Sequence, residues 1–436
     1  MSSAPGRRRT TAVAVIIAGV GLLALSVAAL VPRDTPAPAP ASTPAAQSEL
    51  TRTIAAAQDR LRRVPRDPRT WALLGGAYVE QARVTGDPSY YAKAEGALRS
   101  SLDQQADGNG PALIGMGALA NARHQFTEAR EWGERAKAAA PDTAEVYGVL
   151  ADAYTQLGDT TAATDAVQRM LDLEPGVPSF TRAAYDLEIR GRVDEARQAL
   201  DRALTAAGSV ADTSFCHYQL GELAFDNGDL DAAAGHYADG LRVDPAGTAP
   251  RHGQAKLAAA RGQTDDAIAR YGELVARTPL PQYVHEYAVL LRAAGRTADA
   301  DAQFTVLDRQ RTLAGAAADD LADAEVAADR GDAATALRLA QAEWGRRQNV
   351  LVADALAWAL HLNGRDAEAI TYADKAAATG WRNATFAFHR GMILAALGRG
   401  PEAMTALEDA LKINPRFSPL HAPTAERALA DLRSGR

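Results

Sequence analysis

The stretch that decides the fold is residues 144–177, AEVYGVLADAYTQLGDTTAATDAVQRMLDLEPGV. Its first half places Tyr147, Leu150 and Tyr154 at spacings that put them on one face of a helix. Gly158 then ends that helix, because glycine adopts the left-handed conformation of a helix C-cap without a steric penalty. The second half predicts another amphipathic helix, which Pro175 closes. The stretch is therefore a pair of helices, and neither can bury its apolar face alone.

The same unit recurs along the chain at a nearly constant spacing. Its inter-helix glycines, at intervals of 33, 37, 34, 33, 36, 33 and 34 residues, are Gly158, Gly191, Gly228, Gly262, Gly295, Gly331, Gly364 and Gly398. An alanine follows each glycine five residues later, beginning with Ala163. One unit earlier, His124 takes the glycine's place and Ala129 still follows. This period predicts an array of stacked helix pairs, each touching only its neighbours.

The unit resembles the tetratricopeptide repeat (TPR), whose 34 residues follow the pattern W-x2-L-G-x2-Y, then A-x3-F, then P. The positions that carry the resemblance are Trp71, Leu74, Gly75 and Tyr78 in the first unit and Gly158, Ala163 and Pro175 in the third. About ten units fit the pattern, from Pro68 to about Arg416. The resemblance implies an all-α fold, a right-handed superhelical solenoid in which the first helix of each unit lines a concave groove.

Composition agrees with closely packed helices and excludes one class of partner. Hydrophobic residues make up 47% of the 436 residues, but aromatic residues only 6%. The net charge is -7 and the sequence pI is near 5.7. A nucleic-acid-binding surface would need a basic stripe, whereas Lys and Arg are dispersed here among Asp and Glu. We therefore expect no nucleic-acid partner.

The N-terminus predicts a membrane anchor. A short basic segment, residues 1–9, precedes 22 uncharged residues, Thr10–Val31, which as a helix would span about 33 Å. Positive charge before the segment predicts a cytoplasmic N-terminus and an extracytoplasmic repeat array. The alternative is a signal peptide cleaved near Ser26-Val27-Ala28, which would make the protein secreted. Both interpretations place the repeats outside the cytoplasm.

The remaining chain divides into a spacer, an array and two caps. The predicted segments are a Pro/Ala-rich linker at 32–48, an N-terminal capping helix at 49–66, the repeat array at 67–416 and a C-terminal cap at 417–436. Two stretches depart from the period. The first unit carries about seven extra residues at Thr85–Tyr91, either a binding loop or an insertion whose tyrosines pack locally. After Leu307 there is no break until Gly331, which predicts a longer helix or a change in superhelical register.

Catalytic chemistry is not indicated by any motif. The chain lacks a phosphate-binding loop, a nucleophile elbow and a dinucleotide-binding turn, so we expect no cofactor and no enzymatic activity. The eight histidines are scattered without metal-ligand spacing, so we expect no metal site. Cys216 is the single cysteine, and its neighbour His217 would point about 100° away on a helix.

What remains is the groove that the resemblance implies. Its lining positions in the third to sixth units are occupied by Glu145, Asp152, Gln156, Tyr185, Glu188, Phe215, Tyr218, Glu222, Phe225, Asp226, His252 and Lys256. Aromatic and acidic side chains suit a protein or peptide segment with apolar and basic anchors. The alternative is that the aromatic residues fill gaps between adjacent first helices. The lysine and asparagine clamp of some TPR proteins is missing, because Ala72 and Gly76 stand where it would begin.

These observations favour a membrane-tethered scaffold that recruits or assembles partner proteins through the groove. The alternative is a structural protein that self-assembles through its array ends or the insertion at 85–91. The oligomeric state, the partner and the pathway do not follow from the sequence.

Overall fold

The computed structural model describes residues 45–315 and 318–435, and in this part the chain forms 22 α-helices. The predicted all-α fold is confirmed. The first helices of ten pairs are α2 (Pro68–Thr85), α4 (Gly110–Ala122), α6 (Ala144–Leu157), α8 (Val177–Glu188), α10 (Val210–Asp226), α12 (Thr248–Ala260), α14 (Pro281–Ala293), α16 (Asp320–Arg330), α18 (Val350–Leu362) and α20 (Ala384–Ala396). The second helices are α3 (Ser89–Gln104), α5 (Phe126–Ala139), α7 (Thr160–Leu173), α9 (Val193–Ala206), α11 (Leu230–Val243), α13 (Thr264–Arg277), α15 (Thr297–Ala314), α17 (Ala333–Arg346), α19 (Asp366–Ala377) and α21 (Gly400–Ile413). The helix α1 (Ala45–Arg63) precedes the pairs and α22 (Ala422–Ser434) follows them. The predicted transmembrane segment, 10–31, lies outside the described residues, and none of the helices described here is both long and apolar enough to span a bilayer.

The turn inside the third unit is formed by two consecutive residues. In the third unit Gly158 has a φ of 84° and ends α6 in the left-handed conformation. Asp159 follows and its carboxylate accepts a hydrogen bond from the amide of Ala162 at 3.1 Å, which caps the start of α7. Glycine thus stops one helix and aspartate begins the next.

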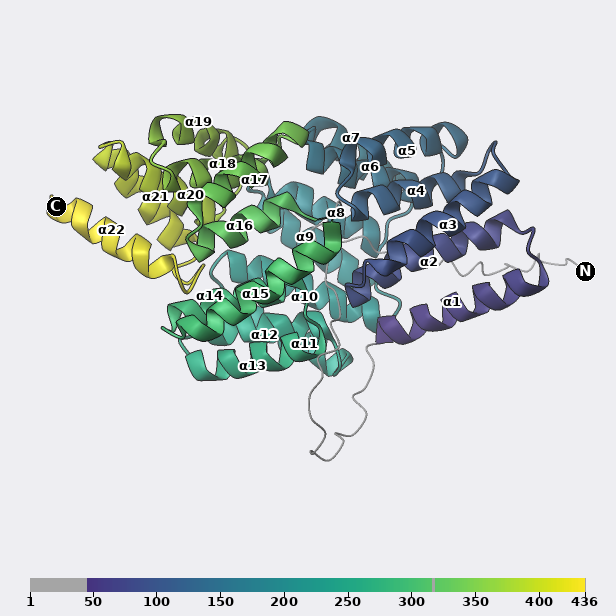
Figure 1. Ribbon diagram of the computed structural model, residues 1–436, viewed down its shortest axis with the longest axis horizontal. Coiled ribbons are helices and arrows are strands. Elements are labelled where there is room, and N and C mark those ends of the chain that lie inside the picture. The colour runs from purple at the N-terminus through teal and green to yellow at the C-terminus, as the bar shows by residue number, and fades with distance from the viewer. Residues whose placement is uncertain (1–44, 316–317, 436) are drawn as a thin grey trace, which may run out of the picture.

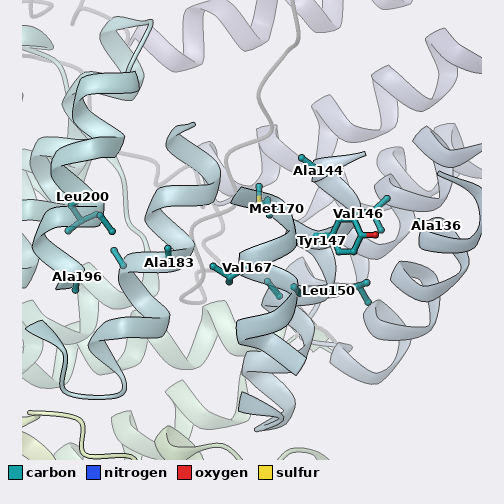
Figure 2. Close-up of a cluster of buried hydrophobic side chains, with 14 of the residues drawn as sticks. Ala136, Ala144, Val146, Tyr147, Leu150, Val167, Met170, Ala183, Ala196 and Leu200 are labelled. Atoms are coloured by element: carbon teal, nitrogen blue, oxygen red, sulfur yellow. The ribbon is translucent and has the colours of Figure 1, made fainter. Parts of the chain in front are cut away.

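Each pair buries its apolar face against the neighbouring pairs. Figure 2 shows Tyr147 and Leu150 of α6 beside Val167 and Met170 of α7, with Leu200 of α9 in the same cluster. Leu150 is only 1% exposed. Burying a side chain of this size contributes roughly 1.5–3 kcal/mol, so these contacts stabilise the packing of first helices on second helices.

Large side chains of second helices insert between glycines of successive first helices. Tyr237 of α11 is fully buried between Gly221 of α10 and Gly253 of α12. A Cβ at Gly221 or Gly253 would lie 2.4 or 2.3 Å from the tyrosine ring. The glycine of the repeat pattern is therefore a packing requirement between helices.

The extra residues of the first unit extend helices. Helix α2 has 18 residues and α3 has 16, whereas α6 and α7 have 14 each. Tyr91 is 6% exposed in the local core, and the ring of Tyr90 lies 5.9 Å from that of Tyr78. These contacts favour the interpretation in which the tyrosines pack locally. Helix α15 is longer than usual, with 18 residues, but it ends at Ala314 and α16 begins at Asp320, so the expectation of no break between Leu307 and Gly331 was wrong.

The array coils tightly enough for successive turns to touch. Figure 1 shows α1 and α22 toward opposite ends of the long axis, with the helix pairs coiling between them. Contacts join what we call the first turn (α4 to α10) to the second turn (α15 to α21). The side-chain amide of Asn349 donates to the carbonyl of Gln156 at 2.9 Å, and that of Asn414 donates to the carbonyl of Phe225 at 2.8 Å. These partners are 193 and 189 residues apart.

Candidate functional site: the inner face of the coil

First helices form the inner layer of the coil. Each contacts the next first helix, as α10 contacts α12 and α16 contacts α18. Equivalent positions of successive units meet there: the Tyr218 hydroxyl lies 3.2 Å from Nδ1 of His252, and Nε2 of His252 lies 2.5 Å from a carboxylate oxygen of Glu286. Both pairs are 34 residues apart, one repeat length. We define the inner face as the first-helix side chains that take part in these unit-to-unit contacts or lie beside them.

A charged cluster occupies the centre of the inner face. Lys256 donates to Glu222 at 2.7 Å, and its ammonium lies 4.4 Å from the centre of the Phe225 ring. Burial disfavours charged Lys256, but the charges of Glu222, Asp226 and Glu286 outweigh it and raise its pKa. Burial also opposes the ionised form of Glu286, yet His252 and Lys256 hold its pKa at about 2. Lys256 and Glu286 are therefore both charged at neutral pH.

Three carboxyl groups on the inner face have raised pKa values. Within the described part of the chain, Glu188, Asp226 and Glu325 form no ion pair. Loss of hydration raises the pKa of Glu188 to about 8, of Asp226 to about 6 and of Glu325 to about 7, and neighbouring carboxylates add to the shift, whereas Lys256 and His285 oppose it at Asp226 and Glu325. The side chains of Asp226 and Glu325 are exposed. Added positive charge would stabilise the ionised form of all three.

The C-terminal half of the inner face is rich in histidine. Asp329 of α16 lies 2.9 Å from both His285 of α14 and His421, the residue before α22. Despite burial, these two histidines lower the pKa of Asp329. His389 of α20 lies 2.8 Å from Asp354 of α18. These contacts join α22 to the coil and neutralise part of its acidic lining.

The predicted groove residues separate into two groups. Tyr218, Glu222, Asp226, His252 and Lys256 meet on the inner face around α10 and α12. Tyr185 and Glu188 of α8 lie beside them, and Asp152 forms a largely buried ion pair with Arg182 at 2.8 Å. Glu145 is half-buried near the start of α6.

The other predicted residues serve packing. Phe215 packs in a core cluster with Val177 and Cys216, and Phe225 is 6% exposed in the core beside Tyr237. Gln156 contacts the second turn. Substituting alanine for either phenylalanine would lower the free energy of unfolding by about 3–5 kcal/mol through lost packing. Such a variant would therefore change stability as well as binding.

Sequence reasoning missed Glu286, Glu325 and Asp329 because the groove positions were carried only through the sixth unit. Glu325 and Asp329 stand six and two residues before Gly331, as Glu222 and Asp226 stand before Gly228. Continuing the same count along the chain would have identified two of the three. The inter-turn contacts have no comparable signal in the repeat period.

A cleft of about 770 Å³ opens where the two turns meet. Trp132 and Arg135 line it from α5, and Asp320 and Arg346 line it from the second turn. Arg346 is paired with Asp320 and Glu343, so the cationic and anionic groups of the cleft largely neutralise one another. The cleft therefore carries no clear preference for an anion or a cation.

Metal ligands and thiols are the remaining groups that could support chemistry. In residues 45–315 and 318–435, no group of three or more His, Cys, Asp or Glu side chains is arranged to hold a metal ion. Cys216 is fully buried, and burial raises its pKa to about 12, so its thiolate is disfavoured.

Comparison with known proteins bears on the repeat unit. The tetratricopeptide repeat family matches residues 144–176. That unit is a TPR. No curated protein matches the chain. Among solved structures, a tetratricopeptide repeat protein from Parabacteroides merdae is 16% identical, with a TM-score of 0.36, over 59% of this chain and 98% of its own.

Two further solved structures are similar to this chain at low identity. A thermophilic TPR protein of Thermus thermophilus is 21% identical, with a TM-score of 0.36, over 41% of this chain and 92% of its own. A chain of the Cut9-Hcn1 hetero-tetramer of the APC/C is 12% identical, with a TM-score of 0.39, over 89% of this chain and 94% of its own.

Proposed function

We propose that this protein is a membrane-tethered scaffold that binds partner proteins outside the cytoplasm through the inner face of its TPR array. A TPR-type helical repeat fold is generally a protein-interaction scaffold. The observation that carries the finer proposal is the excess of carboxyl groups on the inner face, where Glu188, Asp226 and Glu325 form no ion pair and have raised pKa values. A partner would supply matching positive charge.

The chemistry of the inner face suggests an extended or helical segment with Lys or Arg beside apolar anchors. Tyr185 and Tyr218 offer aromatic surface beside the unpaired carboxyls. Aromatic faces attract cations, and complementary charge favours the correct partner over others. The inner face would therefore recognise the segment through its alternating basic and apolar side chains, which would contact successive first helices.

The test neutralises the inner face without touching the core. Asp226→Asn with Glu325→Gln removes two inner-face carboxylates. Asp194→Asn with Glu368→Gln makes the same chemical change on second helices, where the side chains are 85% and 57% exposed. Partners captured from membranes would be identified, and their basic segments synthesised and titrated against each variant.

Loss of affinity of about tenfold or more is expected for the inner pair, and little change for the outer pair. Equal affinity in both variants would contradict binding at the inner face. Equal losses in both would indicate a general charge effect.

The tether rests on Thr10–Val31 and the basic residues before it. Full-length protein should remain in membranes after alkaline extraction, whereas a chain without residues 10–31 should be released. Protease added outside the cytoplasm should digest the array. A protected array would contradict the proposed orientation, and a processed N-terminus would indicate the secreted alternative.

A further inference from the structure

Contacts between the first and second turns of the coil recur once per unit along each turn. Gly158 approaches Gln348, Gly191 approaches Gly380, and Gly228 approaches Ile413. From each contact to the next, the position in the first turn of the coil moves to the following inter-helix loop, and the position in the second turn moves to the following connection between units. One unit earlier, His124 of the first turn lies 3.4 Å from Asp319 of the second. The regular advance shows that these contacts come from the geometry of the coil.

The contacts satisfy groups that a helix leaves unsatisfied. The last carbonyls of a helix have no intrahelical partner. The carbonyls of Gln156 and Phe225 lie in the last turns of α6 and α10, and they accept the amides of Asn349 and Asn414 from the second turn; that of Phe225 also accepts the amide of Gly228 at 2.9 Å. Asn349 is 7% exposed and Asn414 is 1% exposed. The second turn thus caps two helices of the first.

His124 supports the same conclusion from backbone conformation. Among the described non-glycine residues it alone has a positive φ, 59°. A non-glycine residue in this conformation costs about 1–2 kcal/mol and persists where its surroundings hold it. Its ring packs on Phe126, whose other contact is the Arg347 guanidinium of the second turn at 4.7 Å. The contact between turns holds the strained residue in place.

One contact between the turns reaches the inner face itself. Trp381 lies in the connection 378–383 between α19 and α20, next to Gly380. The centre of its ring lies 6.1 Å from that of Tyr185 in an edge-on arrangement, and its indole lies close enough to Glu188 to lower the pKa of that carboxyl. Two residues predicted to bind a partner are therefore contacted by the chain's own second turn.

We propose that the inter-turn contacts hold the coil closed over its inner face, and that Trp381 covers the surface of Tyr185 and Glu188 until the turns separate. The proposal concerns access to the inner face. It goes beyond the proposed function, because it holds whatever binds there.

Closure is tested by removing two donors isosterically. Asn349→Asp keeps the acceptor that caps Val352, and Asn414→Asp keeps the acceptor for Arg416. Both substitutions lose the amide that donates across the turns, and both place a negative charge at the negative end of a helix. The matched control is Asn109→Asp with Asn363→Asp, whose side-chain hydrogen bonds stay within neighbouring units.

The readout is a cysteine introduced at the exposed Asp226, beside the Phe225 carbonyl. Native Cys216 is fully buried and serves as the internal unreactive thiol. In the Asn349→Asp, Asn414→Asp chain we expect a polymer-linked maleimide to react at least about tenfold faster than in the control, with a larger radius of gyration in X-ray scattering. Equal rates and equal radii in folded chains would overturn closure.

The role of Trp381 is tested separately with a cysteine at Tyr185 and a small maleimide. Trp381→Ala should accelerate labelling several-fold, whereas Trp381→Phe, which retains an aromatic ring, should leave the rate near that of the parent chain. No acceleration with Trp381→Ala would overturn the covering role. Neither result depends on a partner, so failure here and failure of partner capture are distinguishable.

Discussion

Substituting alanine for glycine at two equivalent turns separates backbone strain from inter-turn contact. Gly191 and Gly364 end the first helices of their units with φ values of 72° and 69°. A Cβ at Gly191 would lie 2.3 Å from the carbonyl oxygen of Gly380, whereas nothing lies within 4 Å of a Cβ at Gly364. Both substitutions therefore place alanine in the left-handed conformation, but only Gly191→Ala also creates a clash with another backbone.

The shared cost is the left-handed conformation, about 1–2 kcal/mol for alanine. The additional cost at Gly191 is overpacking against a backbone carbonyl, about 1–3 kcal/mol, because no flexible side chain can move aside. Separation of the turns would relieve the clash, so the additional cost cannot exceed the free energy of the inter-turn contacts. We expect Gly191→Ala to lose about 1–3 kcal/mol more than Gly364→Ala.

The assay is urea unfolding followed by circular dichroism, with X-ray scattering on the folded chains. Shifts in midpoint are converted with a common m-value, which is valid only if the two variants unfold with equal slopes. Gly191→Ala should also enlarge the radius of gyration, and Gly364→Ala should not. Equal losses of stability with equal radii would refute the reasoning.

Three further outcomes are expected. The pKa of Glu188 is raised to about 8, so between about pH 4.5 and pH 8 the folded state holds a proton that the unfolded state has released, and the free energy of unfolding should fall as pH rises through this window. Between pH 5 and about 8.5, the thermal midpoint of the Glu188→Gln variant should therefore fall less than that of the parent chain. Tyr237→Phe removes the hydroxyl that donates to Glu222 at 2.5 Å and should cost about 1–2 kcal/mol in urea unfolding; no loss would show that this bond adds nothing to stability. Arg182→Gln leaves Asp152 without its partner and should cost about 3–5 kcal/mol; Asp152→Asn in the same chain should recover part of it.

The helix pairs could be predicted from sequence because each depends on residues within one repeat length. Gly158 and Asp159 encode the turn between α6 and α7, and the spacing of Tyr147 and Leu150 encodes the buried face. Groove positions were predictable for the same reason, since a fixed count from Gly228 places Glu222 and Asp226 on one face.

The closure of the coil could not be predicted in this way. Gly191 and Gly364 occupy the same position in their units, yet only one meets another backbone. The difference depends on the small rotation between successive pairs, summed over more than five units, and no local pattern records that sum. His124, a non-glycine residue at a glycine position, was the one local departure that coincided with an inter-turn contact.

The separation of 189 to 193 residues between hydrogen-bonded partners has a consequence for how this gene can change. Repeat arrays commonly gain or lose whole units, since each unit contacts only its neighbours. Here, duplication or deletion of one unit between α11 and α17 would displace Asn349 and Asn414 from their carbonyls together. The number of repeats in that interval is therefore under constraint, while units could be added beyond α21 without breaking a single existing contact between turns.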